Sequence, residues 1–198
     1  MKLFDKWDTT EIKVEDPALK KYIYLDGILL PRTGGKAAQG QRIWVQKTHI
    51  VERLMNKLMV SGHKGKKHKI SSGHNTGKAT IVYKAVKRCF EIIEEKTKKN
   101  PVEVFVKAIE NGAPREEITA IEYGGARYSK AVEVSPQRRV DLALRYMVQG
   151  AYQKSFNSKK KIEQTLADEI IAASNTDQAH SNVIAKKLEA ERQSDASR

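Results

Sequence analysis

The sequence is poor in cysteine, with Cys89 as the single thiol among 198 residues. One thiol permits no internal disulfide, and it excludes the multi-cysteine frameworks that hold structural zinc. His63, His68 and His74 match no common ligand spacing either, so we expect no metal site. Cys89 falls on the apolar side of a predicted helix, where we expect a small buried side chain. A reducing, cytoplasmic setting fits this cysteine usage.

Long apolar runs are also absent. No stretch approaches the roughly 18 uninterrupted apolar residues that a membrane-spanning helix needs, and residues 1–16 lack the apolar centre of a signal peptide. Hydrophobic residues make up 39% of the chain, which is enough for a core but below the usual share. We therefore expect one domain with extensions, or at most two small domains, and no membrane partner.

Acidic residues are scarce relative to basic ones. The chain has 37 Lys and Arg against 24 Asp and Glu, which gives a formal net charge of +13. A compact fold with this surplus repels itself unless an acidic partner, most often nucleic acid, neutralises it. Two glycine-containing segments, residues 31–47 and 61–77, carry basic residues and no acid. They predict an extended arm and a basic loop.

Most of the remaining sequence has the period of amphipathic helices, with apolar residues recurring every three or four positions. Asn100-Pro101 and Ser135-Pro136 each join a capping side chain to a proline that suits the first helical position. These signals predict helices over residues 48–62, 77–97, 101–112, 136–152, 160–174 and 177–191.

The period changes to about two after the third predicted helix. Two β-prone runs joined by Gly124-Gly125 predict a hairpin over residues 118–134, because glycine tolerates the positive φ of a tight turn. A two-stranded ribbon is marginally stable alone, so we expect its base to lean on a neighbour. Tyr123 and Tyr128 either stack on unpaired bases or form a cross-strand pair that stiffens the ribbon.

The predicted fold class is mainly α: a bundle of about six helices with an inserted, protruding β-hairpin and an extended basic N-terminal arm. The expected divisions are an N-terminal arm at 1–47, a helical RNA-binding domain at 48–191 and a flexible tail at 192–198.

Basic side chains gather in loops and at element ends, where they can meet phosphates. Any one of these groups could be an ordinary solvated face, but their joint occurrence favours nucleic-acid binding. The candidate RNA-binding residues are Arg32, Arg42, Lys47, Lys64, Lys66, Lys67, Lys69, Lys78, Tyr123, Gly124, Gly125, Arg127, Tyr128, Lys130, Arg138, Arg139, Arg145, Lys159, Lys160 and Lys161.

Residues 73–78 superficially resemble the phosphate loop of nucleotide hydrolases. Three residues separate Gly73 from Gly77 where the loop needs four, and Ala79 stands where it needs a Ser or Thr for magnesium. The spacing argues against nucleotide hydrolysis, and we expect no cofactor. Backbone N–H groups at a helix start beside Lys78 still suit a phosphate, including one of an RNA backbone.

Seven short segments share the order and spacing of one known family. They are MV at 59–60, TIVY at 80–83, NPVEVFVKAIEN at 100–111, GGARY at 124–128, VEVSPQRR at 132–139, ALRY at 143–146 and LADE at 166–169. Over about residues 48 to 190 they resemble the ribosomal protein seven family of the small subunit. Residues 1–47 and the insertion within 61–77 resemble its archaeal or eukaryotic form.

This resemblance implies a non-enzymatic, cytoplasmic protein of the ribosome. The family binds the 3′ major domain of small-subunit rRNA and organises the head of the subunit early in assembly. Its hairpin lies near exit-site tRNA and the mRNA path, so the implied partners are these RNAs and neighbouring head and platform proteins.

The resemblance carries over most closely to Arg138 and Arg139 and to the hairpin tip with Arg127 and Tyr128. Bacterial members place two arginines just before the Gly-Gly, where this chain has the sequence IEY. The ascending strand is therefore expected to contact RNA less, or by stacking.

Two other functions stay open at this stage. An RNA-binding regulator outside the ribosome would be captured with RNA but without ribosomes. A phosphate-transfer enzyme using residues 73–78 would show nucleotide turnover that Lys78→Ala abolishes.

Overall fold

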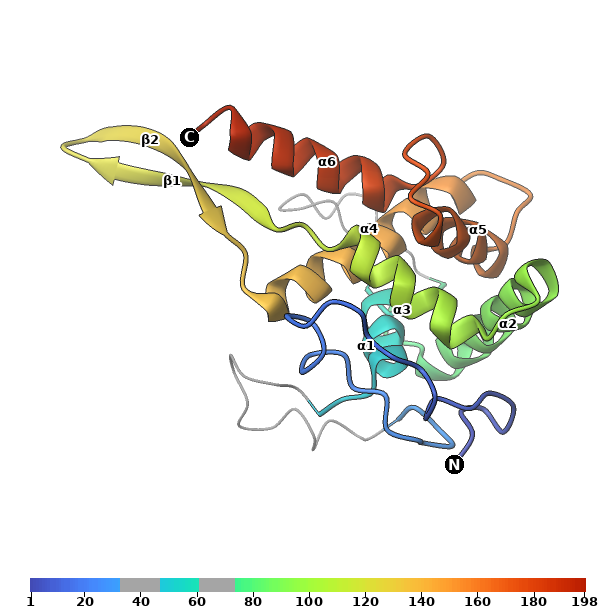
Figure 1. Cartoon of the computed structure of the whole chain (residues 1–198). Helices are drawn as coiled ribbons and strands as arrows, with labels where there is room; N and C mark the ends of the chain where they lie inside the picture. The colour runs from blue at the N-terminus through green and yellow to red at the C-terminus, as the bar shows by residue number, and fades with distance from the viewer. Residues whose placement is uncertain (33–46, 61–73) are drawn as a thin grey trace.

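Figure 1 shows the computed structural model, which describes residues 1–32, 47–60 and 74–198. Its elements are α1 (Ile50–Leu58), α2 (Ala79–Thr97), α3 (Pro101–Gly112), β1 (Glu116–Tyr123), β2 (Ala126–Glu133), α4 (Pro136–Ser155), α5 (Ile162–Ser174) and α6 (Asn182–Asp195). Within these described residues, six helices and one hairpin confirm the predicted mainly α fold. Most of the predicted arm and of the basic loop, residues 33–46 and 61–73, lies outside them.

The helical core is arranged around α5, which packs against α2, α3 and α4. Phe90, Phe105 and Leu166 are among its fully buried side chains. Cys89 lies in the same core, and its burial raises the pKa of its thiol far above the ordinary value. The expectation of a small buried side chain at this position is confirmed.

Residues 1–30 form part of this core rather than an extension lying apart from it. Leu3, Phe4 and Trp7 are buried, and the rings of Phe4 and Phe90 meet edge to face at 6.3 Å between centroids. The indole N–H of Trp7 donates to a Glu94 carboxylate oxygen at 3.0 Å. The sequence analysis assigned these residues to the N-terminal arm, because their partners on α2 are more than 80 residues away in the sequence.

The start of α6 differs from its prediction. Asp177, the predicted start, instead holds a turn: its carboxylate accepts from the backbone N–H groups of Ala179 and His180. The cap of α6 is Ser181, whose Oγ accepts from the N–H of Ile184. Both residue types favour helix starts and turns, and the prediction placed the start at Asp177, one turn too early. The helix then continues to Asp195, four residues past its predicted end at 191.

The hairpin projects from the helical body and is supported at its base (Figure 1). Gly124 and Gly125 form its tip with φ of +58° and +82°, which are values that glycine adopts without strain. The hairpin packs against α6, and the C-terminal Arg198 forms an ion pair with Glu116. These contacts confirm that the base leans on a neighbour.

His49 caps α1 from a fully buried position. Its Nδ1 accepts from the backbone N–H of Val51 at 3.2 Å, and its Nε2 has no hydrogen-bond partner within the described part of the chain. Burial lowers the pKa of His49 from 6.5 to about 4. The folded chain therefore holds this imidazole neutral at a pH where the unfolded chain protonates it.

We expect stability to fall as pH drops from 6.5 towards 4. In that window the unfolded state binds a proton that the folded state excludes, so the free energy of unfolding rises with pH. Over this whole pH window, the titration of His49 changes the free energy of unfolding by roughly 3 kcal/mol. Urea unfolding at a series of pH values measures it. The variant His49→Asn retains a capping acceptor but does not titrate, and an equally steep acid loss in this variant would refute the assignment.

Candidate nucleic-acid interface

The exposed side of α4 forms a line of polar and aromatic side chains. A helical turn of 100° per residue puts positions 138, 145, 149, 152 and 156 within about 40° of one direction. We call Arg138, Arg145, Gln149, Tyr152 and Phe156 the α4 stripe; Arg138, Arg145 and Phe156 are exposed, and Gln149 and Tyr152 are partly buried. With 20 residues in the helix, this stripe extends over about 30 Å.

Arg138 joins the N-terminal end of the α4 stripe to the hairpin. Its Nε and one terminal nitrogen donate to the two carboxylate oxygens of Glu117 at 2.7 and 2.6 Å. This paired geometry lowers the pKa of the Glu117 carboxyl below its ordinary value. It fixes β1 against α4 and leaves the Arg138 side chain half exposed.

The two faces of the hairpin differ in chemistry. Successive side chains alternate between faces, and Tyr128 pairs with Ile121 while Tyr123 pairs with Ala126. Tyr123, Tyr128, Ile121 and Lys130 therefore share one face, which we call the aromatic face. Tyr123 is 81% exposed and Tyr128 is 60% exposed. The register makes the two tyrosines diagonal neighbours, so they do not form a directly opposed pair.

The aromatic face carries one carboxylate, Glu117, which Arg138 neutralises. The other three acids of the strands, Glu116, Glu122 and Glu133, lie on the opposite face. Arg127 also lies on that opposite face, 3.7 Å from Glu122, so the structure does not bring it together with Tyr128. The aromatic face is continuous with the α4 stripe through Arg138. Its exposed tyrosine rings can stack on bases, and it carries little positive charge.

A pocket of about 740 Å³ lies at the C-terminal end of the α4 stripe. Its walls come from the turn before α2, from the end of α4 and from the segment leading into α5. Lys160 and Lys161 line it beside His74 and Asn75, and Lys159 is exposed next to them. The end of the segment at 61–77 and the lysines at 159–161, about 85 residues apart in the sequence, thus meet here.

Arg139 occupies a different place from Arg138. It is 8% exposed, and its terminal nitrogen contacts a carboxylate oxygen of Asp16 at 3.0 Å. Arg139 therefore ties the N-terminal segment to α4, and its guanidinium is enclosed rather than presented to a phosphate. That it binds RNA stays a prediction.

The other predicted residues divide into exposed positions and positions outside the described ranges. Arg32, Lys47, Lys78 and Lys130 are exposed, and Lys78 caps α2. Arg42, Lys64, Lys66, Lys67 and Lys69 lie in the ranges that the structure does not describe. They belong to segments with six basic residues and no acid.

Acidic side chains gather at the other end of α2. Glu91 pairs with Lys6 at 2.5 Å and with Arg88 at 3.1 Å, and Glu94 holds Trp7. From Ile81 in the pocket to the last turn of α2 is about 24 Å along the helix. These paired acids lie away from Ile81, whereas Lys96 in the last turn shares the Asp168 carboxylate with the pocket residue Lys160.

Sequence reasoning missed Gln149, Tyr152 and Phe156. A signal was present, because these residues continue the spacing of Arg138 and Arg145 along one helical direction.

Within the described ranges, no three His, Cys, Asp or Glu side chains gather as metal ligands, and no helix is long and apolar enough to cross a membrane.

A comparison with known proteins identifies the family of this chain. The family model for ribosomal protein S7p/S5e matches residues 31–198. The chain belongs to this family. The match extends the S7 resemblance from about residues 48–190 towards the N-terminus.

Archaeal relatives of the S7 family match the chain at close to full length. It is 54% identical over 198 residues to the small ribosomal subunit protein uS7 of Nanoarchaeum equitans, covering all of this chain and 99% of that protein. It is 49% identical over 191 residues to the uS7 of Methanosphaera stadtmanae, covering 96% of this chain and 95% of that protein. The predicted archaeal or eukaryotic form of the family is confirmed, and these relatives are archaeal.

Proposed function

We propose that this S7-family chain is a structural protein of the small ribosomal subunit, acting in cytoplasmic ribosomes by binding rRNA without catalysis. The observation that carries this proposal is the continuous surface from the aromatic face along the α4 stripe to the lysines of the pocket. Archaeal relatives named as small-subunit proteins match the whole chain, which supports the same conclusion.

The mechanism is scaffolding. Arg145 near the middle of α4 and the lysines of the pocket at its C-terminal end neutralise phosphates of RNA segments that would otherwise repel one another, and so favour one tertiary arrangement. The two ends of α4 are about 30 Å apart, which lets one protein contact separate RNA helices. The rigid pairing of Arg138 with Glu117 holds the hairpin at a fixed angle to this surface.

The RNA in question is the 3′ major domain of small-subunit rRNA, and the chain joins it early enough to organise the subunit head. The hairpin reaches towards exit-site tRNA and the mRNA path, where its tyrosines stack on unpaired bases. Neighbouring head and platform proteins complete its surroundings. The low positive charge of the strands fits contact by stacking.

The test combines sedimentation with RNA binding. The chain is expected to sediment with small subunits through a moderate salt wash. In isolation it is expected to bind a transcript of the 3′ major domain more tightly than a 5′-domain transcript of equal length. Equal affinity for both transcripts, or capture with RNA in fractions free of ribosomes, would overturn the assignment and favour a regulator outside the ribosome.

A further inference from the structure

The pocket at the end of the α4 stripe is lined by apolar, aromatic and charged side chains. Phe156 is 61% exposed and Ile81 is 49% exposed, and both line it. The Tyr152 ring lies 5.9 Å from the Phe156 ring, at an interplanar angle of 41°. Exposed apolar side chains that converge on one cavity indicate a binding site rather than chance exposure.

The position of Phe156 is set by the backbone. Phe156 ends α4 in an extended conformation, and Asn157 follows with φ of +53°. Asparagine tolerates this left-handed backbone conformation, which turns the chain sharply. The ring of Phe156 is therefore held at the rim of the pocket by the turn, next to the partly buried Tyr152.

Positive charge surrounds these rings. Among the residues that the structure describes, Lys161 forms no ion pair, and Lys160 makes a 3.9 Å contact with Asp168, which Lys96 holds at 2.5 Å. The pocket also contains the first residues of α5, a helix with no side-chain cap at Lys161. Helix N–H groups and lysines together favour a phosphate.

The pocket also has groups that can recognise the edge of a base. Asn75 is buried in its lining, and an amide can donate and accept hydrogen bonds. Glu163, the one carboxylate in the lining, can accept from an exocyclic amino group. A volume of about 740 Å³ falls within the range of small-molecule sites.

We infer that this pocket receives an unstacked nucleotide of the bound RNA. The base stacks on Phe156, and its phosphate lies against Lys160 and Lys161 at the start of α5. This inference rests on the proposed function, since it names how one part of the rRNA is held. Aromatic stacking and adjacent cations are the usual means of holding unpaired RNA bases.

The test is the binding of the full chain to the 3′ major domain transcript with Phe156→Ala. We expect affinity to fall on the order of tenfold with an unchanged salt dependence, because stacking neutralises no phosphate. Phe156→Tyr should restore affinity. Leu188→Ala is the matched control, since Leu188 is an exposed apolar residue on α6, away from the pocket, and should bind as the wild type does.

Ultraviolet cross-linking followed by mass spectrometry supplies a second readout. The expected cross-linked peptide contains Tyr152 or Phe156 joined to a nucleotide. If Phe156→Ala binds normally and no such peptide forms while the wild type still binds the transcript, the pocket inference is overturned and the proposed function stands. If the wild type shows no preference for the transcript, the proposed function fails first.

Discussion

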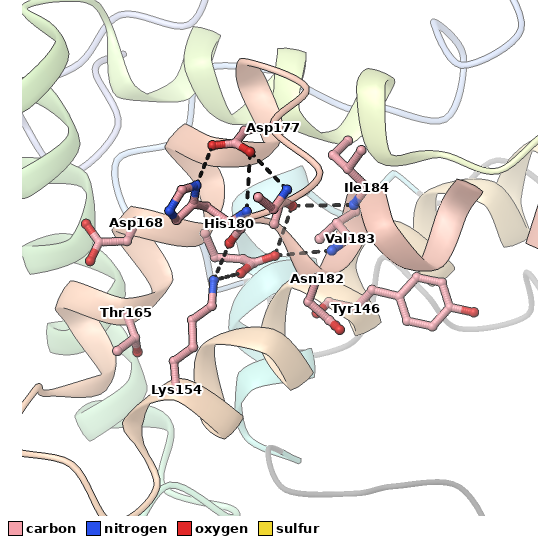
Figure 2. Close-up of polar contacts among 12 residues, drawn as sticks. Tyr146, Lys154, Thr165, Asp168, Asp177, His180, Asn182, Val183 and Ile184 are labelled. Carbon is pink, nitrogen blue, oxygen red and sulfur yellow. Dashed lines mark hydrogen bonds and ion pairs between the residues drawn. The ribbon is translucent and has the colours of Figure 1, made fainter. Parts of the chain in front are cut away.

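Replacing Glu169 by alanine is expected to destabilise the fold by about 3 kcal/mol or more. The Glu169 carboxylate is fully buried where α4, α5 and α6 meet. It accepts from Lys154 Nζ at 2.6 Å, from Ser181 Oγ at 3.0 Å and from the backbone N–H of Val183 at 3.2 Å (Figure 2). Its loss leaves two buried donors at the start of α6 without an acceptor.

Urea unfolding measures this effect and separates its causes. Glu169→Gln is expected to cost less, because its amide oxygen can still accept from Ser181 and Val183 although the charge facing Lys154 is gone. Glu189→Ala is the control, since Glu189 forms an exposed pair with Lys186 and should change stability by less than about 0.5 kcal/mol. A loss of under 1 kcal/mol in Glu169→Ala would contradict this account of the α6 start.

The second large effect concerns RNA affinity. The triple variant Arg145→Gln, Lys160→Gln and Lys161→Gln removes three cations from the α4 stripe and the pocket. Each lost phosphate contact makes the log–log dependence of affinity on salt less steep by about 0.7 to 0.9, so the slope should flatten by roughly 2 to 3. The affinity loss should be greatest at low salt and small at high salt, where ions already screen the phosphates.

The choice of these three residues follows from the surroundings of the arginines in α4. Arg138 is excluded because its loss would leave the Glu117 carboxylate unpaired, and Arg139 because its pairing with Asp16 makes it part of the fold. Arg145 is exposed and forms no ion pair with another residue that the structure describes. Filter binding over a range of salt concentrations gives both the affinity and the slope.

Local chemistry predicted some elements closely. The Asn100 side chain accepts from the N–H of Val102 at 3.1 Å, and α3 begins at Pro101 and ends at Gly112 as its capping signals indicated. The hairpin tip also lies at its Gly-Gly pair. Such signals act within a few residues, so they can be read from sequence without knowledge of the tertiary fold.

Tertiary packing decided the features that the sequence analysis missed. Arg138 and Arg139 are adjacent, but 100° of helical rotation separates them. Arg138 shares its direction with Arg145, whereas Arg139 shares its direction with the buried Leu142 and Ala143. The partner of Arg139, Asp16, is 123 residues away, and no local pattern reveals such a contact.

Some features of the candidate surface could likewise be predicted from the sequence, and others could not. Net charge and loop composition predicted nucleic-acid binding by the pocket lysines. They did not predict the α4 stripe, which depends on helical direction, or the separation of aromatic and acidic side chains between the hairpin faces, which depends on strand register. The register follows from the two-residue turn at Gly124-Gly125, but the sequence analysis did not extend it to the two faces of the hairpin.

The central claim is that RNA contacts the α4 stripe and pocket and not the far end of α2. A side-by-side comparison of salt slopes tests it. The matched triple variant is Lys98→Gln and Lys99→Gln at the α2–α3 turn with Lys107→Gln on α3. Both triples remove the same charge from the chain. The account predicts a slope flattened by roughly 2 to 3 for the stripe variant and nearly unchanged for the α2–α3 variant. Equal flattening in both would show that net charge, not this surface, drives binding.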